Sequence, residues 1–301
     1  MAVGVDYGGT KIEAIVLDTA GVELGRRRVP TPRNDYAGSI VAIKELVHGL
    51  EADLGVEPSA MGIGTPGAVG ADGRVAEGNS TWLIGQPLGA DLSAALSRPV
   101  RVANDGNCLA LSEAIDGAGA GHRVVFTAII GTGVGGGLVI DQKLVEGNSG
   151  MTGEWGHSPL PIADPATEFP GPQCFCGRRG CIETWIAGPG LEADYARQIG
   201  QTGTRVPQMV ALAQDGDAQA RQTLKLHLQR SARALSTVVN VIDPDVVVLG
   251  GGISNLPNFA EDLNREIRAH LYSSLSTVKI VRAKFGDSSG VRGAARLAME
   301  G

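Results

Sequence analysis

The sequence lacks an excess of basic residues, a long apolar run and a large number of cysteines. Its 26 lysines and arginines are outnumbered by 32 aspartates and glutamates, and the formal net charge is −6. No broad basic surface is available for a phosphate backbone, so we expect no nucleic-acid partner. No apolar run approaches the roughly 20 residues of a membrane helix, and the amino terminus lacks the segments of a signal peptide. We therefore expect a cytoplasmic protein with no membrane partner.

The four cysteines are too few and too clustered for the disulfide framework of a secreted protein. Three of them, Cys174, Cys176 and Cys181, lie in one short loop that follows His157. Three thiolates and one imidazole form a closed tetrahedral set for Zn²⁺ that leaves no position for water, so we expect a structural zinc that fixes the loop. The alternative is a redox-active cysteine cluster. Cys108 is left over, and we expect it to be a buried helix residue.

Two glycine-rich turns, at residues 6–10 and 131–137, are each flanked by β-prone runs. Glycine lets the backbone turn tightly and approach a ligand closely. The recurrence of strand, turn and strand favours two related α/β domains, each of which opens with a hairpin. We expect a smaller N-terminal domain of residues 1–118 plus 289–301, and a larger domain of residues 119–288 that contains the zinc loop.

Helical and strand patterns fill the rest of the two halves. Apolar residues at helical spacing predict a helix over 40–54 and a long helix near 218–241. A strand at 245–249 runs into the triple glycine 250–252, and we expect a helix to follow it directly. Backbone N–H groups and the positive end of a helix at one spot suit a phosphate or the flat ring of a nucleoside.

The second glycine turn formally matches a dinucleotide-binding fingerprint, because Gly131-Thr132-Gly133-Val134-Gly135-Gly136 reads G-x-G-x-x-G. The residues after it predict a strand, whereas the fingerprint needs a helix N-terminus for the pyrophosphate. The sequence also lacks the G-x-x-x-x-G-K-[ST] pattern of a P-loop. We therefore expect a hairpin turn that wraps around nucleotide phosphates.

Two aspartates stand where strands are predicted to end. Asp6 precedes the first glycine turn, and a carboxylate beside a phosphate-binding turn can hold Mg²⁺, while Lys11 can add a positive charge there. Asn104 and Asp105 follow a predicted strand, and capping of the next helix is the simpler role for such residues. Strand ends in α/β sheets are also where ligands bind. We expect Asp105 to accept the proton of a hydroxyl that attacks phosphorus.

Glu154 and Glu183 stand on either side of the cysteine loop. Isolated glutamates are usually solvated, but a zinc-fixed loop would hold both carboxylates in the rigid geometry that recognition of sugar hydroxyls requires. His157 would bind the metal through one ring nitrogen and leave the other for a hydrogen bond to a ligand or a neighbouring group.

Taken together, the two glycine turns, Asn104-Asp105, Gly153-Glu154-Trp155-Gly156-His157, the cysteine loop and the triple glycine resemble the ROK family of bacterial sugar kinases and repressors. The resemblance covers nearly the whole chain. It implies an α/β, two-domain actin-like ATPase (ribonuclease H-like) fold, with the sugar and Mg-ATP in the interdomain cleft. It also implies a homodimer, and it identifies Asp105 as the general base.

The residue patterns and the resemblance together give a set of candidate site residues. The expected sugar-binding residues are Gly67, Asn79, Thr81, Asn104, Asp105, Glu154, His157 and Glu183. The expected residues around ATP and Mg²⁺ are Asp6, Gly8, Gly9, Thr10, Lys11, Gly131, Thr132, Gly133, Gly135, Gly250, Gly251 and Gly252. The expected zinc ligands are His157 and the three clustered cysteines.

Within the family, residues 63–67, 79–83 and 156–161 look most similar to fructokinases of the mannofructokinase type. We therefore expect transfer of the γ-phosphoryl group of ATP to the 6-hydroxyl of fructose, with N-acetylglucosamine kinase and then glucokinase as alternatives. A sugar-responsive transcriptional regulator is an alternative of a different class. Against it, the first hairpin begins at Val3, which leaves no room for an N-terminal DNA-binding helix-turn-helix. A zinc module that binds a partner protein is a third alternative.

Overall fold

The computed structural model describes residues 1–57, 60–70, 72–78 and 80–299. The chain forms two compact units. The first unit comprises Met1–Arg123, Gly137–Gly153 and Lys284–Gly301, and the second comprises Val124–Gly136 and Glu154–Ala283. Residues 119–123, 137–153 and 284–288 thus belong to the first unit, whereas the sequence-based division placed them in the second domain.

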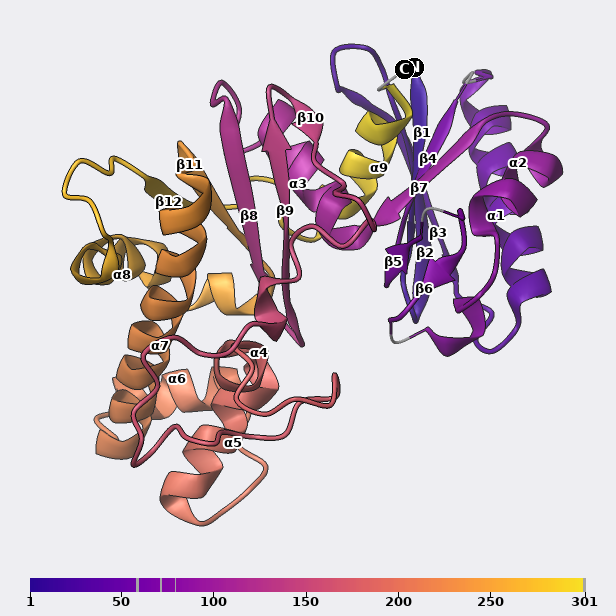
Figure 1. The fold of residues 1–301 in the computed structure, drawn as a ribbon. Helices are drawn as coiled ribbons and strands as arrows, with labels where there is room; N and C mark the ends of the chain where they lie inside the picture. Colours follow the sequence, from indigo (N-terminus) through magenta and orange to yellow (C-terminus); the bar gives the residue numbers. More distant parts are fainter. Residues whose placement is uncertain (58–59, 71, 79, 300–301) are drawn as a thin grey trace. The chain divides into compact units, whose positions relative to one another are not determined.

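The first unit combines strands and helices (Figure 1). Its strands are β1 (Ala2–Tyr7), β2 (Lys11–Leu17), β3 (Glu23–Pro30), β4 (Met61–Thr65), β5 (Ala68–Val69), β6 (Val75–Ala76), β7 (Val100–Asn104) and β10 (Lys143–Leu144). Its helices are α1 (Tyr36–Leu54), α2 (Leu88–Leu96), α3 (Asp105–Ile115) and α9 (Ser289–Met299), with short 3₁₀ turns at η1 (Thr81–Leu83) and η5 (Gly286–Ser288).

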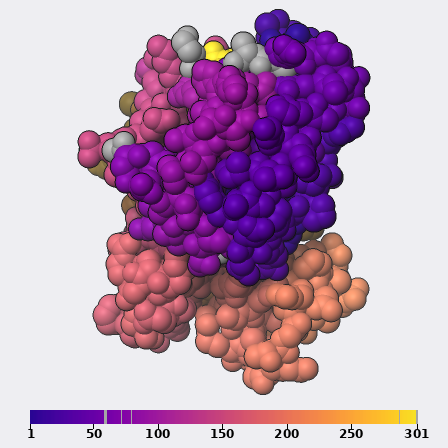
Figure 2. All heavy atoms as spheres, turned by 90° about the vertical axis from the view of Figure 1, so that its right-hand side faces the viewer, coloured from indigo at the N-terminus to yellow at the C-terminus, as the bar shows by residue number. Residues whose placement is uncertain are grey.

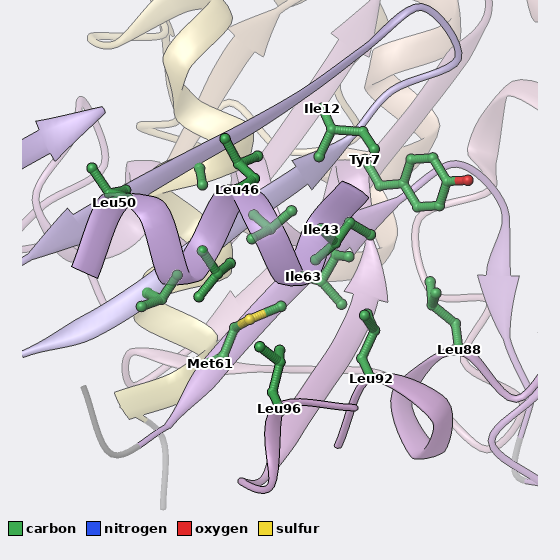
Figure 3. Close-up of a cluster of buried hydrophobic side chains, with 14 of the residues drawn as sticks. Tyr7, Ile12, Ile43, Leu46, Leu50, Met61, Ile63, Leu88, Leu92 and Leu96 are labelled. Carbon is green, nitrogen blue, oxygen red and sulfur yellow. The ribbon is translucent and has the colours of Figure 1, made fainter. Parts of the chain in front are cut away.

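A five-stranded sheet in the order β3-β2-β1-β4-β7 forms the centre of the first unit. The first three strands are antiparallel neighbours, whereas β4 and β7 run parallel to β1. One face of the sheet packs against α1 and α2 in an apolar core that includes Tyr7, Ile12 and Met61 (Figure 3). Figure 2 shows, in indigo to purple, the surface that the N-terminal part of this unit presents on one face.

The opposite face of this sheet packs closely against α9. A Cβ atom at Gly4 would overlap the Val291 carbonyl oxygen, and one at Gly62 would overlap the Ala294 carbonyl oxygen. Glycine at these two positions therefore lets the helix lie against the strand backbones. Asp6 lies two residues after Gly4 in β1, so its side chain projects from the same face as Gly4.

The second unit contains the remaining elements, and β9 (Val134–Ile140) crosses the division. Its strands are β8 (Val124–Ile130), β11 (Val246–Gly250) and β12 (Lys279–Arg282). Its helices are α4 (Glu183–Ile186), α5 (Gly188–Ile199), α6 (Val206–Gln214), α7 (Ala218–Ile242) and α8 (Phe259–Glu266), with 3₁₀ turns at η2 (Trp155–His157), η3 (Gly252–Asn255) and η4 (Ile267–His270).

The second sheet has the order β10-β9-β8-β11-β12. β10 is antiparallel to β9, whereas β11 is parallel to both β8 and β12. Both sheets therefore have antiparallel strands at one side and parallel strands at the other. The structure thus contains two five-stranded sheets, each of which mixes parallel and antiparallel neighbours.

Two predicted helices begin and end close to where the sequence placed them. The side chain of Asp35 accepts a hydrogen bond from the Gly38 N–H at the start of α1, and Gly55 ends the helix with φ 63°. Asp217 caps α7 in the same way, through the Ala220 N–H. Within the described residues, no helix combines the length and the apolar composition that crossing a membrane requires.

The prediction that a helix directly follows the triple glycine is wrong. Gly250 is the last residue of β11, and only the 3₁₀ turn η3 follows before α8 begins at Phe259. A single short turn does not supply the aligned peptide dipoles of a helix. Phosphate binding at this point would therefore depend on individual backbone N–H groups.

Candidate active site

The first glycine turn joins β1 and β2 as a hairpin, as predicted. Tyr7 pairs with Ile12 at its base, and the Gly8 N–H donates to the Lys11 carbonyl oxygen at 3.0 Å. The Thr31 hydroxyl donates to the Gly8 carbonyl oxygen at 2.7 Å, which attaches β3 to the turn. Gly9 is half-buried and Thr10 is exposed at the end of the turn.

Asp6 carries a carboxylate with unusual electrostatics at the base of this hairpin. Its side chain is partly buried and has no hydrogen-bond partner among the residues that the structure describes. Burial first, and then the charges of Asp105 and Glu13, raise the pKa of Asp6 to about 6. A poorly compensated carboxylate next to a glycine turn fits the oxygen ligands that Mg²⁺ prefers. Lys11 Nζ lies 3.6 Å from Glu13 Oε2, so the ammonium group forms an ion pair with a buried carboxylate.

Asn104 and Asp105 lie at the point where β7 becomes α3. Asn104 caps the helix, because its Oδ1 accepts a hydrogen bond from the Gly106 N–H at 2.7 Å. Its Nδ2 donates to the Gly67 carbonyl oxygen at 3.0 Å, which brings two predicted sugar-binding residues together. Gly67 has φ 89°, and a Cβ there would overlap the Glu77 carbonyl oxygen, so only glycine fits.

Asp105 begins α3 with its side chain accessible to solvent, as contact with a substrate requires. The surrounding protein nevertheless displaces enough water to raise the pKa of the carboxyl group, while a hydrogen bond from the Gly106 N–H acts in the opposite direction. A carboxylate with a raised pKa is a better proton acceptor near neutral pH than an ordinary aspartate.

The stretch that was predicted to line the sugar pocket lies near the first hairpin. Thr81 opens η1, and Trp82 in the same turn donates from its indole N–H to the Tyr7 hydroxyl at 3.0 Å. A Cβ at Gly9 would lie 3.8 Å from the Ser80 hydroxyl, so the stretch approaches the glycine turn itself. Asn79, which the sequence also assigned to the sugar pocket, lies outside the described residues.

The second glycine turn is shorter than the sequence predicted. Only residues 131–133 form the turn, closed by a hydrogen bond from the Gly131 N–H to the Gly133 carbonyl oxygen at 2.9 Å, and Thr132 is exposed at its tip. Gly135 lies inside β9, where its carbonyl oxygen accepts the indole N–H of Trp155 at 2.6 Å. The backbone stays extended at Gly135 because β9 is hydrogen-bonded to its neighbours β8 and β10 in the sheet.

Two other segments of the second unit touch this turn. The Gly188 N–H, at the start of α5, donates to the Gly131 carbonyl oxygen at 2.8 Å. Gly251 has φ 79°, and a Cβ there would lie within 2.6 Å of the Ile130 carbonyl carbon. The glycine turn, the start of α5 and the triple glycine therefore meet at one place, which is what a nucleotide site built from backbone N–H groups needs.

The three clustered cysteines and His157 lie together as predicted. Their candidate ligand atoms are all within 4.8 Å of one another. The sulfur atoms of Cys176 and Cys181 are 3.6 Å apart, and Cys174 Sγ lies 3.5 Å from His157 Nδ1. A tetrahedron with Zn–S bonds near 2.3 Å has edges of roughly 3.8 Å. The separations of 3.5 and 3.6 Å match this edge, and the widest pair, at up to 4.8 Å, would have to close by roughly 1 Å for all four atoms to reach a zinc ion.

His157 presents its two ring nitrogens to different partners. Nδ1 faces the cysteine cluster, whereas Nε2 lies 4.0 Å from Glu154 Oε2. Phe175 packs edge-on against the ring at 4.9 Å and limits its rotation. With Nδ1 committed to the cluster, Nε2 is the nitrogen that remains available to a ligand.

Glu183 connects the cysteine cluster with the second glycine turn, a relationship that the sequence did not predict. Its Oε2 accepts a hydrogen bond from the Val134 N–H at 2.9 Å, and its Oε1 lies 4.0 Å from Cys174 Sγ. Trp155 provides a second connection through Gly135. The only sequence signal for Trp155 is its position between Glu154 and His157.

A buried ion cluster, also missed from the sequence, holds α4 and the segment before the cysteine loop. Arg230 in α7 contacts Glu168 at 2.8 Å and Asp194 at 2.6 Å, and its guanidinium lies 4.6 Å from the Trp185 ring centroid. Burial opposes ionisation of Glu168, but hydrogen bonds from Arg230, the Asp164 backbone and Arg233 outweigh it and lower the pKa of Glu168. Since Trp185 lies two residues after Glu183, the cluster fixes the helix that carries this glutamate.

Comparisons with known proteins agree over the full length of the chain. The ROK family model matches residues 2–300. An N-acetyl-D-glucosamine kinase of Shigella flexneri serotype 5b (strain 8401) is 41% identical over 302 residues, which cover 99% of this chain and 99% of the relative. The N-acetyl-D-glucosamine kinase of Escherichia coli O139:H28 (strain E24377A / ETEC) shows the same identity and coverage.

Solved structures give the same result. A ROK hexokinase from Thermus thermophilus has a TM-score of 0.88 and 33% identity over 99% of this chain and 97% of its own. A ROK family glucokinase from Streptomyces griseus, in complex with glucose and AMPPNP, has a TM-score of 0.80 and 29% identity over 100% of this chain and 99% of its own. The fold is thus the actin-like ATPase fold that the sequence predicted. The chain belongs to the ROK family and is one of its sugar kinases.

Proposed function

We propose that this protein is an ATP-dependent N-acetylglucosamine kinase that transfers the γ-phosphoryl group of ATP to the 6-hydroxyl of the sugar. The observation that carries the proposal is the 41% identity to N-acetyl-D-glucosamine kinases over 99% of both chains. The Streptomyces griseus glucokinase, solved with glucose and an ATP analogue, supports ATP and a hexose as the substrate pair.

Asp105 acts as the general base in this proposal. The sugar 6-oxygen attacks the γ-phosphorus and forms the new P–O bond while the bond to the bridging β-γ oxygen breaks, and ADP leaves. The proton of the hydroxyl passes to the Asp105 carboxylate, whose raised pKa suits it to this task. We assign phosphate binding to the backbone N–H groups of each glycine turn, Gly8 to Thr10 and Gly131 to Gly133.

Mg²⁺ is the expected partner of ATP. The Asp6 carboxylate would hold the ion, directly or through water, and the bound ion would supply positive charge to the phosphate oxygens. Lys11 adds positive charge near the same turn. Gly250 to Gly252 lie against the nucleoside.

We assign binding of the sugar hydroxyls to Asn104, the Gly67 backbone, Glu154, His157 and Glu183. Carboxylates and a neutral imidazole accept and donate the hydrogen bonds that sugar hydroxyls need. His157 and the three cysteines would hold a zinc ion that fixes the loop. This zinc would be structural rather than catalytic, because four protein ligands leave no position for water.

Fructose, which the sequence motifs favoured, is not supported by these relatives. Residues 63–67 and 79–83 reflect a sugar pocket shared across the family, and a single pocket contact can alter the choice among hexoses. The alternative of N-acetylglucosamine is therefore preferred. The homodimer stays a prediction.

A coupled assay of ADP release tests the proposal. The purified protein is given ATP and Mg²⁺ with N-acetylglucosamine, glucose, mannose or fructose in parallel. We expect the highest kcat/KM with N-acetylglucosamine and a product phosphorylated at the 6-position. A higher kcat/KM with fructose would restore the first expectation, and no turnover with any of the four sugars would contradict the kinase assignment.

A further inference from the structure

A cavity of about 300 Å³ lies in the first unit beside Asn104. Val69, Val102 and Ala103 provide apolar walls, and the amide side chains of Asn104, Asn107 and Asn148 provide polar ones. Neither Asp105 nor Asp6 lines it. The cavity is therefore separate from the proposed proton acceptor, although it shares Asn104 with the sugar site.

Asn107 is a buried polar residue of this cavity whose side-chain oxygen lacks a partner among the described residues. It lies in α3 one turn after Asn104, and its side chain is 3% exposed. Its Oδ1 is buried and accepts no hydrogen bond from the described residues. Buried amide groups are nearly always paired in folded proteins. An unpaired amide oxygen at the wall of a cavity indicates a ligand that donates a hydrogen bond to this oxygen.

The chemistry of the walls restricts what this ligand can be. Glu146 lies at the cavity and disfavours an anionic group. The apolar walls suit a methyl group, and the amide side chains suit a neutral group that both donates and accepts hydrogen bonds. An acetamido group, CH₃–CO–NH–, has both of these parts.

We propose that this cavity receives the 2-acetamido group of the sugar, an inference that rests on the proposed function. In this proposal Asp105 contacts the 6-hydroxyl, and Asn104 contacts the hydroxyls on the ring carbons between carbon 5 and carbon 2. Carbon 2 then lies on the far side of Asn104 from Asp105. The methyl group packs against Val69 and Val102, and the amide of the ligand pairs with Asn107. Asn107 is then a specificity-determining residue.

Discrimination against glucose follows from this arrangement. Glucose carries only a hydroxyl at carbon 2, which leaves the cavity wall uncovered and the Asn107 amide unpaired. A site built to hydrogen-bond a substrate group selects strongly against analogues that lack the group. The ratio of kcat/KM for N-acetylglucosamine to that for glucose therefore measures the contribution of the cavity.

The experiment compares this ratio in the wild type, Asn107→Leu and Val69→Phe. Leucine removes the amide at similar volume, and phenylalanine fills the space of the methyl group. Ser112→Ala is the matched control, because Ser112 is buried in the same helix with an unpaired hydroxyl but does not line the cavity. Thermal melting shows whether each variant is folded. Val69→Phe serves if Asn107→Leu fails to fold.

We expect the ratio to fall by about tenfold in both cavity variants and to stay at the wild-type value in Ser112→Ala. A wild type that prefers N-acetylglucosamine, with unchanged ratios in both folded variants, would overturn the cavity assignment and leave the proposed function intact. A wild type with no activity on N-acetylglucosamine would overturn both proposals.

Discussion

Glu183 accepts a hydrogen bond from the backbone N–H of Val134 at 2.9 Å. The carboxylate that we assign to the sugar thus also holds the end of the glycine turn that we assign to the phosphates, both within the second unit. Its other oxygen lies 4.0 Å from Cys174 Sγ, so the same side chain reaches the proposed metal ligands. Three proposed functions of the second unit therefore depend on the position of one residue.

Replacement of Glu183 separates its two roles. In Glu183→Gln the amide oxygen can still accept from the Val134 N–H, but the negative charge is lost, so we expect KM for the sugar to rise about tenfold with little change in KM for ATP. In Glu183→Ala the turn also loses its partner, so both KM values should rise. Steady-state kinetics with each substrate varied in turn measures this, with the exposed Glu261→Gln as the control. If Glu183→Gln and Glu183→Ala change KM for ATP by the same factor, the Val134 contact has no role in ATP binding.

Removal of the metal should lower stability and activity together. Metal analysis of the purified protein should find one zinc per chain, and Cys181→Ser should lose it, with a lower melting temperature and lower activity. Cys108→Ala removes a cysteine outside the cluster, so it should keep its zinc. A verified zinc-free protein that melts at the same temperature would argue against a structural metal.

The sequence predicted most reliably those features that depend on neighbouring residues. The first hairpin, helix α1 and the cysteine cluster all follow from short-range spacing, and the structure contains each of them. The end of the second glycine turn was misplaced, because Gly135 is drawn into β9 by strand pairing and by Trp155. Local glycine content does not reveal such pairing.

Contacts between distant segments could not be read from the sequence. Arg230 and Glu168 are far apart in the chain, and neither lies in a recognisable motif, yet they form a buried ion pair at 2.8 Å. The link from Glu183 to Val134 is likewise invisible before folding. The choice of sugar is hard to predict for a related reason, since it depends on how side chains from several elements shape one pocket.

The ionised Asp6 carboxylate, which the proposed function requires, should lower the free energy of unfolding. Its pKa of about 6 in the folded state lies above its unfolded value of 3.8, so the folded state holds the proton more tightly and stability falls as pH rises from about 4 to about 6. Asp6→Asn removes this penalty. We expect it to gain about 1–2 kcal/mol of unfolding free energy at pH 7.5, measured in urea, and to lose activity.

The gain in Asp6→Asn should shrink as pH falls from about 6 to about 4, because both side chains are neutral below that range. Asp215→Asn, at an exposed site in the second unit, is the control and should show no such pH dependence. If Asp6→Asn is less stable than the wild type at pH 7.5, the ionised Asp6 carboxylate does not destabilise the folded state.

His227 should make the protein sensitive to acid. Its ring is 1% exposed, Nε2 lies 2.8 Å from the Ile186 carbonyl oxygen, and burial lowers its pKa to about 4. The unfolded state binds a proton near pH 6.5 and the folded state does not, so stability is lost as pH falls from about 6.5 to about 4, by about 2–3 kcal/mol in total. His227→Gln should flatten this part of the stability profile, whereas the exposed His48→Gln should leave its slope unchanged. An equal slope in all three proteins would exclude His227 as the cause.

The turnover of Asp105→Asn tests the central claim most directly. Asparagine keeps the shape of the side chain but cannot accept the proton of the sugar hydroxyl. With N-acetylglucosamine and ATP, we expect kcat to fall by about 10²–10⁴-fold, while zinc content and sugar affinity by calorimetry stay at wild-type values. A kcat within a few fold of the wild type would show that Asp105 is not the base and would contradict this account of phosphoryl transfer.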